Sequence, residues 1–266
     1  MKILFENFAL PPTVITAPGQ SENYPAQNLV HPYLRKRYQT VSGADTITFD
    51  LKSDKSLDSF SYGYNNASEE WRITEDGELR ITEDGETRCI SSASMTVNLR
   101  DYLGTLLYTM TAAQTEQFGA FHFTQVDMVR FVEIVIDWAG VGGAYLGGVG
   151  FGISTELDFP LADWLDHDID SSEVSRTQAG FVSQEYAEPY LERVYNFTNI
   201  GQADYLDIRA KISAIGKGRP VWIDCFEEDH TFQAPFYATI DEGIQNPTRD
   251  AEMGTWSFTL VFKEAR

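Results

Sequence analysis

The chain has 266 residues, which suits one large domain or two ordinary ones, and 13% of them are aromatic. With 40 acidic and 20 basic residues its formal net charge is −20, and such a surface repels nucleic-acid phosphates and anionic lipid headgroups. No apolar run is long enough to span a bilayer. The composition therefore disfavours direct nucleic-acid binding and membrane insertion.

The N-terminal segment MKILFENFALPP carries a short apolar stretch that Glu6 and Asn7 interrupt. It lacks the continuous apolar core and small-residue cleavage site of a signal peptide, which predicts synthesis in the cytoplasm. The phrase YPAQNLVHPYLRKRYQT follows from Tyr24. In it Asn28 is suited to hold a turn by bonding neighbouring backbone groups, and Leu29 supplies an apolar anchor.

The one basic cluster of the chain lies in the same phrase, at Arg35, Lys36 and Arg37. Three positive charges are too few for a nucleic-acid footprint. The next segments, 46–51 and 57–64, alternate polar and apolar residues with the period of half-buried strands. Their alternation places the following side chains inward: Leu57, Phe60, Tyr62 and Tyr64.

An internal repeat comes next, because RITEDGE occurs at 72–78 and again at 80–86. Each copy ends in an Asp-Gly turn dipeptide, which predicts an exposed acidic β-hairpin over 71–90. A calcium loop is the alternative, since each copy offers several carboxylates. The repeat lacks the alternate ligand positions around a glycine that calcium loops use, and this favours plain turns.

Segment 97–117 is ambiguous between helix and strand, because its leucines suit a helical stripe that Gly104 interrupts. We predict a strand over 104–110. Strands are also predicted over 130–138 and 145–152. The glycines of the latter indicate close packing of backbones rather than a dinucleotide loop, since no helical pattern follows.

Together these phrases resemble the galactose-binding-like, or discoidin-like, β-sandwich domain of many tail proteins of tailed phages. The similarity spans about half of the chain, and Tyr38 stands where that family usually has Trp. The matching positions are Ala26, Asn28, Leu29, Pro32, Ile47, Asp50, Leu51, Gly63, Asn65, 130–138 and 145–152. The resemblance implies an antiparallel β-sandwich over 1–152.

An acidic linker is predicted over 153–172. Its aspartates at 166, 168 and 170 are spaced as in an EF-hand loop, but the central glycine and flanking helices of that motif are missing. Strands are predicted over 175–187, 189–198, 220–226, 233–240 and 254–263. Between them a helix over 201–216 buries Tyr205, Ile208, Ile212 and Ile215 and ends at Gly216.

The sequence thus predicts a mainly β chain. Its first domain, at 1–152, is a galactose-binding-like β-sandwich with a β-hairpin insertion at 71–90. The second domain, at 173–266, is an antiparallel β-sheet or sandwich with one packed α-helix. The phrase GKGRPVWIDCF in this second domain resembles a segment that follows the helix in phage tail-tip proteins.

No catalytic, cofactor or metal constellation stands out. The four histidines are scattered, and no HExxH, GxSxG or P-loop motif occurs. Glu227, Glu228 and Asp229 are the candidates for a carboxylate pair of the glycosidase kind, but an acidic turn after a strand is the favoured interpretation. Cys89 and Cys225 could form one bridge, but their spacing favours two buried free thiols. We therefore predict no enzymatic activity and no cofactor.

The resemblance implies a structural virion protein in the tail tip or baseplate of a tailed phage, made in the host cytoplasm. Its partners would be other tail or baseplate proteins, and its own copies would form a homo-oligomeric ring. The alternative is a carbohydrate-binding module that recognises a glycan of the host surface. In that case Tyr62, Tyr64 and Trp71 are the candidate residues for stacking on a sugar ring or contacting a partner.

Overall fold

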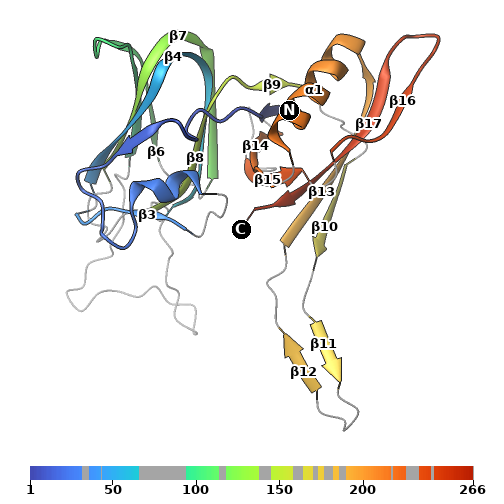
Figure 1. Cartoon of the computed structure of the whole chain (residues 1–266), viewed down its shortest axis with the longest axis horizontal. Coiled ribbons are helices and arrows are strands. Elements are labelled where there is room, and N and C mark those ends of the chain that lie inside the picture. Colours follow the sequence, from blue (N-terminus) through green and yellow to red (C-terminus); the bar gives the residue numbers. More distant parts are fainter. Residues whose placement is uncertain are drawn as a thin grey trace. The chain divides into compact units, whose positions relative to one another are not determined.

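The computed structural model describes residues 1–31, 36–42, 44–65, 94–113, 118–137, 145–157, 164–169, 173–176, 182–185, 190–216, 218–225, 234–240 and 243–265. These residues form antiparallel strands and one α-helix (Figure 1), which confirms the predicted mainly β fold class. They divide into two compact units. No helix among them is long and apolar enough to cross a membrane.

The larger unit is built mainly from Glu6–Ser154 and is called the sandwich unit below. Its sheet has the strand order β3-β8-β4-β7-β5-β6, and β2 also pairs with β4. Its elements are β2 (Val14–Thr16), the short 3₁₀ helix η1 (Ala26–Val30), β3 (Tyr38–Gln39), β4 (Ala44–Asn65), β5 (Ser94–Arg100), β6 (Leu106–Ala113), β7 (Phe118–Asp137) and β8 (Tyr145–Gly152). The segment predicted as a strand over 104–110 thus lies mostly in β6.

Two long strands, β4 and β7, fold this sheet into two halves (Figure 1). The first half of β4 pairs with β2, and its second half pairs with β8. The β4–β7 register shifts between these halves, where Lys52 and Met128 adopt positive φ angles of 66° and 62°. Register shifts of this kind bend a strand pair and increase its twist. One continuous ladder therefore supplies both layers of the sandwich.

A charged cluster holds the bend. The Asp50 carboxylate accepts hydrogen bonds from Arg130 Nε at 2.7 Å and from Lys52 Nζ at 2.7 Å. Partial burial by itself raises the pKa of Asp50, but the bonds from Lys52 and Arg130 outweigh it and lower the pKa to about 2. The carboxylate is therefore ionised throughout the physiological range.

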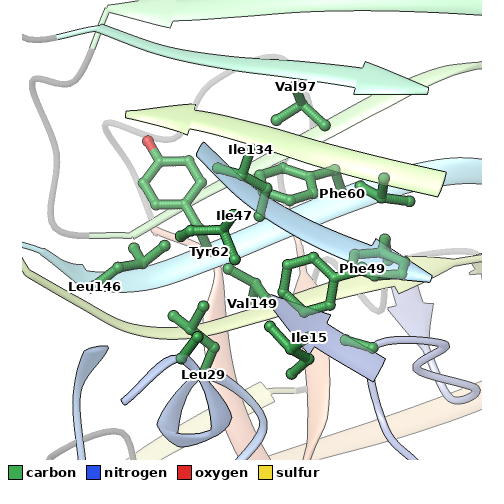
Figure 2. Close-up of a cluster of buried hydrophobic side chains, with 14 of the residues drawn as sticks. Ile15, Leu29, Ile47, Phe49, Phe60, Tyr62, Val97, Ile134, Leu146 and Val149 are labelled. Carbon is green, nitrogen blue, oxygen red and sulfur yellow. The ribbon is translucent and has the colours of Figure 1, made fainter. Parts of the chain in front are cut away.

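Apolar side chains from both halves meet in one core (Figure 2). Phe49 from the first half of β4 contacts Phe151 of β8 edge to face, with ring centroids 5.2 Å apart. Leu29 of η1 is buried in the same core, as the sequence predicts. Tyr38, at the position where the resembling family usually has Trp, is fully buried.

The second unit comprises Met1–Phe5, Thr155–Cys225 and Phe236–Arg266. Its main sheet has the order β10-β13-β17-β15-β14-β1-β9, with β16 paired to β17, and β11 and β12 form a separate ladder. The strands are β1 (Lys2–Leu4), β9 (Thr155–Glu156), β10 (Trp164–Ile169), β11 (Glu173–Arg176), β12 (Val182–Glu185), β13 (Tyr190–Ile200), β14 (Val221–Asp224), β15 (Phe236–Ile240), β16 (Gln245–Arg249) and β17 (Trp256–Glu264).

Helix α1 (Gln202–Ile215) confirms the predicted helix and its C-terminal glycine. Gly216 has φ +68°, which glycine adopts without a steric cost, and its N–H donates to Ile212 O. Tyr205 of the helix is buried and stacks on Trp256 of β17, with ring centroids 4.2 Å apart. The helix thus packs on the sheet through the face that the periodicity indicated.

The units divide the chain differently from the predicted domains of 1–152 and 173–266. The first residues belong to the second unit, because β1 pairs with β14 and with β9. Part of the predicted acidic linker at 153–172 is strand β10, which pairs with β13 from Trp164↔Tyr195 to Ile169↔Tyr190. An edge strand tolerates charged residues on its exposed faces, so its aspartates resemble those of a loop in sequence.

Cys225 is buried and free, and burial raises the pKa of its thiol to about 11. Cys89 and the hairpin predicted over 71–90 lie outside the described residues.

Gly119 leaves room for the ring of Tyr62, and a substitution can test this close packing. These residues are paired across β4 and β7, and a Cβ at position 119 would lie 2.4 Å from the Tyr62 ring. Because the ring is buried, Gly119→Ala is expected to lower the free energy of unfolding by about 1–3 kcal/mol, measured by chemical denaturation. In a Tyr62→Leu background the same substitution should cost less. Equal losses in both backgrounds would show that the ring is not the cause.

Candidate functional site

The residues predicted to contact a ligand lie in different surroundings. Tyr62 is 3% exposed and stacks in the core between Phe60 and Phe121, so its ring is covered by protein. The reason is the alternation along β4, which turns Tyr62 inward. Tyr64 belongs to β4, but its side chain and all of Trp71 lie outside the described residues.

The carboxylate-rich segments give no metal site in the described part of the chain, where no group of three or more His, Cys, Asp or Glu side chains is placed to hold an ion. Asp166 and Asp168 lie in strand β10. The carboxylates of the RITEDGE repeat and those at 227–229 fall outside the described residues.

A different set of residues forms a surface cluster in the sandwich unit. The Arg37 guanidinium lies over the ring of Tyr145, 4.3 Å from its centroid, and over the ring of Tyr24, 5.3 Å from its centroid. Tyr24 is 37% exposed, and the other two residues are half-buried. We call Tyr24, Arg37 and Tyr145 the arginine–tyrosine cluster.

Strand register explains why these three residues meet. In the β3–β8 pair, Gln39 lies opposite Tyr145. On its other side, the Gln39 N–H donates to Tyr24 O at 3.1 Å. Residues two apart in extended backbone share a face, so Arg37 projects on the same side as Gln39. Tyr38 between them points into the core.

The phrase that begins at Tyr24 builds this geometry locally. Helix η1 buries Ala26 and Leu29, which fixes the backbone that follows Tyr24. The Asn28 side chain then donates from Nδ2 to Arg37 O at 2.8 Å. Asn28 is predicted to bond neighbouring backbone, and its side chain instead holds the carbonyl of Arg37, nine residues further along the chain.

The Asp45 carboxylate holds in place the strand that follows Arg37. Its carboxylate accepts hydrogen bonds from Tyr38 Oη at 2.5 Å, from Gly19 N at 3.0 Å and from Thr46 N at 2.8 Å. Burial, and then the bond to Asp45, raise the pKa of the Tyr38 phenol far above its ordinary value. Tyr38 therefore stays neutral and keeps donating, and Arg37 is attached to a fixed strand.

Chemically, the cluster combines an exposed aromatic ring with the planar donor fork of an arginine. Aromatic rings bind apolar faces, and a guanidinium binds oxygen acceptors, often with two parallel N–H groups. No acid, base or nucleophile accompanies them among the described residues of the cluster. The arrangement can bind and orient a ligand.

The β5–β6 turn carries a second feature, an apolar surface that we call the 101–107 tip. Its exposed side chains are Tyr102, Leu103, Leu106 and Leu107. The turn is rigidly held: Asp101 Oδ1 accepts from Leu103 N at 2.9 Å and from Thr105 N at 2.8 Å, and Gly104 takes the left-handed conformation with φ +83°. Four apolar side chains are thus displayed on an ordered turn.

Comparisons with known proteins give fold neighbours and no family. No protein-family model and no curated protein matches the chain. One similar solved structure is the CBM32 of AlyQ in complex with 4,5-unsaturated mannuronic acid, 17% identical over 52% of this chain and 92% of that one, with a TM-score of 0.37. Another is the lectin domain of Lectinolysin complexed with Lewis B antigen, 12% identical over 56% of this chain and 98% of that one, with a TM-score of 0.41. A third is a Streptococcus pneumoniae fucose binding module, 12% identical over 55% of this chain and 94% of that one, with a TM-score of 0.40.

Removal of the Asp45 anchor tests how the cluster is built. Asp45→Ala leaves the buried Tyr38 hydroxyl without its acceptor, so we expect the free energy of unfolding to fall by about 1–3 kcal/mol in chemical denaturation. Ser42→Ala, whose hydroxyl makes only an exposed bond to Ala44 O, is the control and should change stability little. If the two variants unfold alike, Asp45 does not anchor the strand.

Proposed function

We propose that the chain is a non-catalytic binding protein whose sandwich unit recognises carbohydrate through the arginine–tyrosine cluster. The observation that carries the proposal is the position of Arg37. It is half-buried against the rings of Tyr24 and Tyr145, and the Tyr24 side chain is 37% exposed. A sugar presents an apolar ring face and hydroxyl groups together. An aromatic ring beside a positioned donor fork matches both.

Preorganisation supports the same function. The Arg37 carbonyl is bonded to Asn28, and the adjoining Tyr38 is bonded to Asp45. A ligand therefore meets groups whose backbone is already fixed, and less entropy is lost on binding.

Substitution of the exposed ring tests this function. A panel of neutral and acidic glycans is screened with the full chain, and the best ligand is titrated calorimetrically against variants. Tyr24→Ala is expected to weaken binding by about tenfold or more, because the exposed aromatic contact is lost.

Tyr102→Ala is the matched control, since it removes an exposed tyrosine of the same unit at 61% exposure and should leave binding unchanged. Thermal melting must show that both variants stay folded. Absence of glycan binding across the panel, or equal affinities for the two variants, would contradict the proposal.

A second function, supported by the 101–107 tip, is that of a structural subunit acting through protein–protein contacts. We propose the tail tip or baseplate of a tailed phage as its location, with several copies arranged around the tail axis. Exposed Tyr and Leu side chains on a rigid turn suit an interface, where buried aromatic and aliphatic anchors supply most of the binding energy. The phage-like phrases of the sequence agree with this role.

A charge placed on the tip tests the structural function. Leu103 is 72% exposed, so Leu103→Asp should leave the fold intact and abolish incorporation of a tagged copy into particles, scored by electron microscopy. Met253→Asp, at 67% exposure in the other unit, is the control and should incorporate normally. Label absent from particles for the unsubstituted chain, or normal incorporation of Leu103→Asp, would argue against this function.

A further inference from the structure

The charge environment of Arg37 differs from that of the other half-buried arginines that the structure describes. Arg100 pairs with Glu133 at 2.6 Å, Arg130 pairs with Asp50 at 2.7 Å, and Arg193 lies 3.4 Å from Asp166. Arg37 has ring contacts and no carboxylate partner among the described residues.

This difference is informative because carboxylates are abundant. The chain has 40 acidic residues against 20 basic ones, so a partly desolvated guanidinium would readily find a carboxylate in the fold. Within the described part of the chain, the two tyrosine rings are the groups that compensate the Arg37 charge. A ligand that brings its own negative charge would add the carboxylate partner that the other three arginines have.

The surroundings strengthen the positive character of the cluster. Lys36 precedes Arg37 and is exposed. Among the described acidic residues close to Tyr24 in the chain, Glu22 lies in the turn before it and is exposed. The Asp45 carboxylate is already occupied by the Tyr38 hydroxyl and two backbone N–H groups. Arg37, which belongs to the basic cluster of the sequence, thus lies beside the exposed ring of Tyr24.

We propose that the ligand of the arginine–tyrosine cluster is an acidic sugar, in which a carboxylate on the sugar pairs with Arg37 while the ring contacts Tyr24. The inference rests on the carbohydrate-binding function proposed above and names its ligand class. The carboxylate accepts two parallel N–H bonds from the guanidinium, the strongest geometry available to this pair. A bidentate pair of this kind recognises the carboxylate and also fixes the orientation of the sugar.

The experiment compares each acidic ligand with a neutral counterpart that keeps every sugar unit. Calorimetric titration of the full chain uses oligogalacturonate against its methyl ester, and 3′-sialyllactose against its methyl ester. At least one acidic member is expected to bind about tenfold more tightly than its neutral counterpart, because a charge-assisted bidentate pair is lost in the neutral one. The advantage should shrink as salt is raised, since screening weakens an exposed ion pair.

Two variants of Arg37 separate the contribution of the planar guanidinium from the contribution of positive charge alone. Arg37→Gln should abolish the preference for the acidic member, and Arg37→Lys should restore part of it, because lysine supplies charge without the planar fork. Arg209→Gln is the control: it removes one positive charge from an exposed position of α1 and should leave the preference unchanged.

Failure of this inference is distinguishable from failure of the carbohydrate-binding function. Equal binding of acidic and neutral members, unchanged in Arg37→Gln, would overturn the acidic-sugar ligand and leave a module for neutral sugars. Absence of binding to every glycan of the screening panel would overturn both. A preference for the acidic member that Arg37→Gln leaves intact would place acid recognition elsewhere and overturn the assignment to Arg37.

Discussion

The sandwich unit depends on one constraint, the bent ladder between β4 and β7. Because both strands bend where their register shifts, the two ends of β4 are linked through β8 and β3. Tyr38 pairs with Leu146 in β3–β8, and Leu146 pairs with Asn65 at the end of β4, while the Tyr38 hydroxyl bonds Asp45 near its start. A chain of contacts thus closes the two halves at this end of the sandwich, where the arginine–tyrosine cluster lies. The geometry of the cluster follows from the bend.

Charge is distributed according to the same architecture. At the bend, Arg130 and Lys52 neutralise Asp50, and Arg100 neutralises Glu133 beside the β5–β6 turn. These basic residues brace backbone that twists sharply, and each is matched by a carboxylate. Arg37 is held by tyrosine rings instead, so its charge does not stabilise the fold in the same way. Among the described arginines, this difference is the basis for proposing Arg37 as the ligand-binding one.

Sequence patterns predicted the elements whose signal is local. The alternation over 46–51 and 57–64 and the helical face of Tyr205 depend on residues that are close in the chain. The sequence does not predict that β1 pairs with β14, because that pairing joins segments about two hundred residues apart. It does not predict strand β10 either, because the exposed acidic residues of an edge strand resemble those of a loop. Of the candidate contact residues, Tyr62 is predicted from its place near a corner, and the alternation along β4 turns its ring into the core.

The residues of the arginine–tyrosine cluster carry weak signals in the sequence. Arg37 belongs to a basic run, and Tyr145 is the first residue of a glycine-rich strand. Nothing in their spacing links the two, since the contact depends on the register Gln39↔Tyr145 between strands far apart in the chain. A basic cluster in an acidic sequence, adjacent to an aromatic turn residue such as Tyr24, is the pattern that could have indicated this cluster.

The two proposed functions use opposite ends of the sandwich and are therefore compatible. Ser94 pairs with Asp137, which pairs with Ala44 beside the Asp45 anchor, so the start of β5 lies at the end that holds the arginine–tyrosine cluster. The end of β5, at Arg100, leads into the 101–107 tip. An extended strand of that length covers roughly 20 Å at about 3.3 Å per residue. A partner protein seated on the tip would leave the cluster uncovered within this unit, so one copy could be anchored in an assembly while presenting a sugar-binding surface.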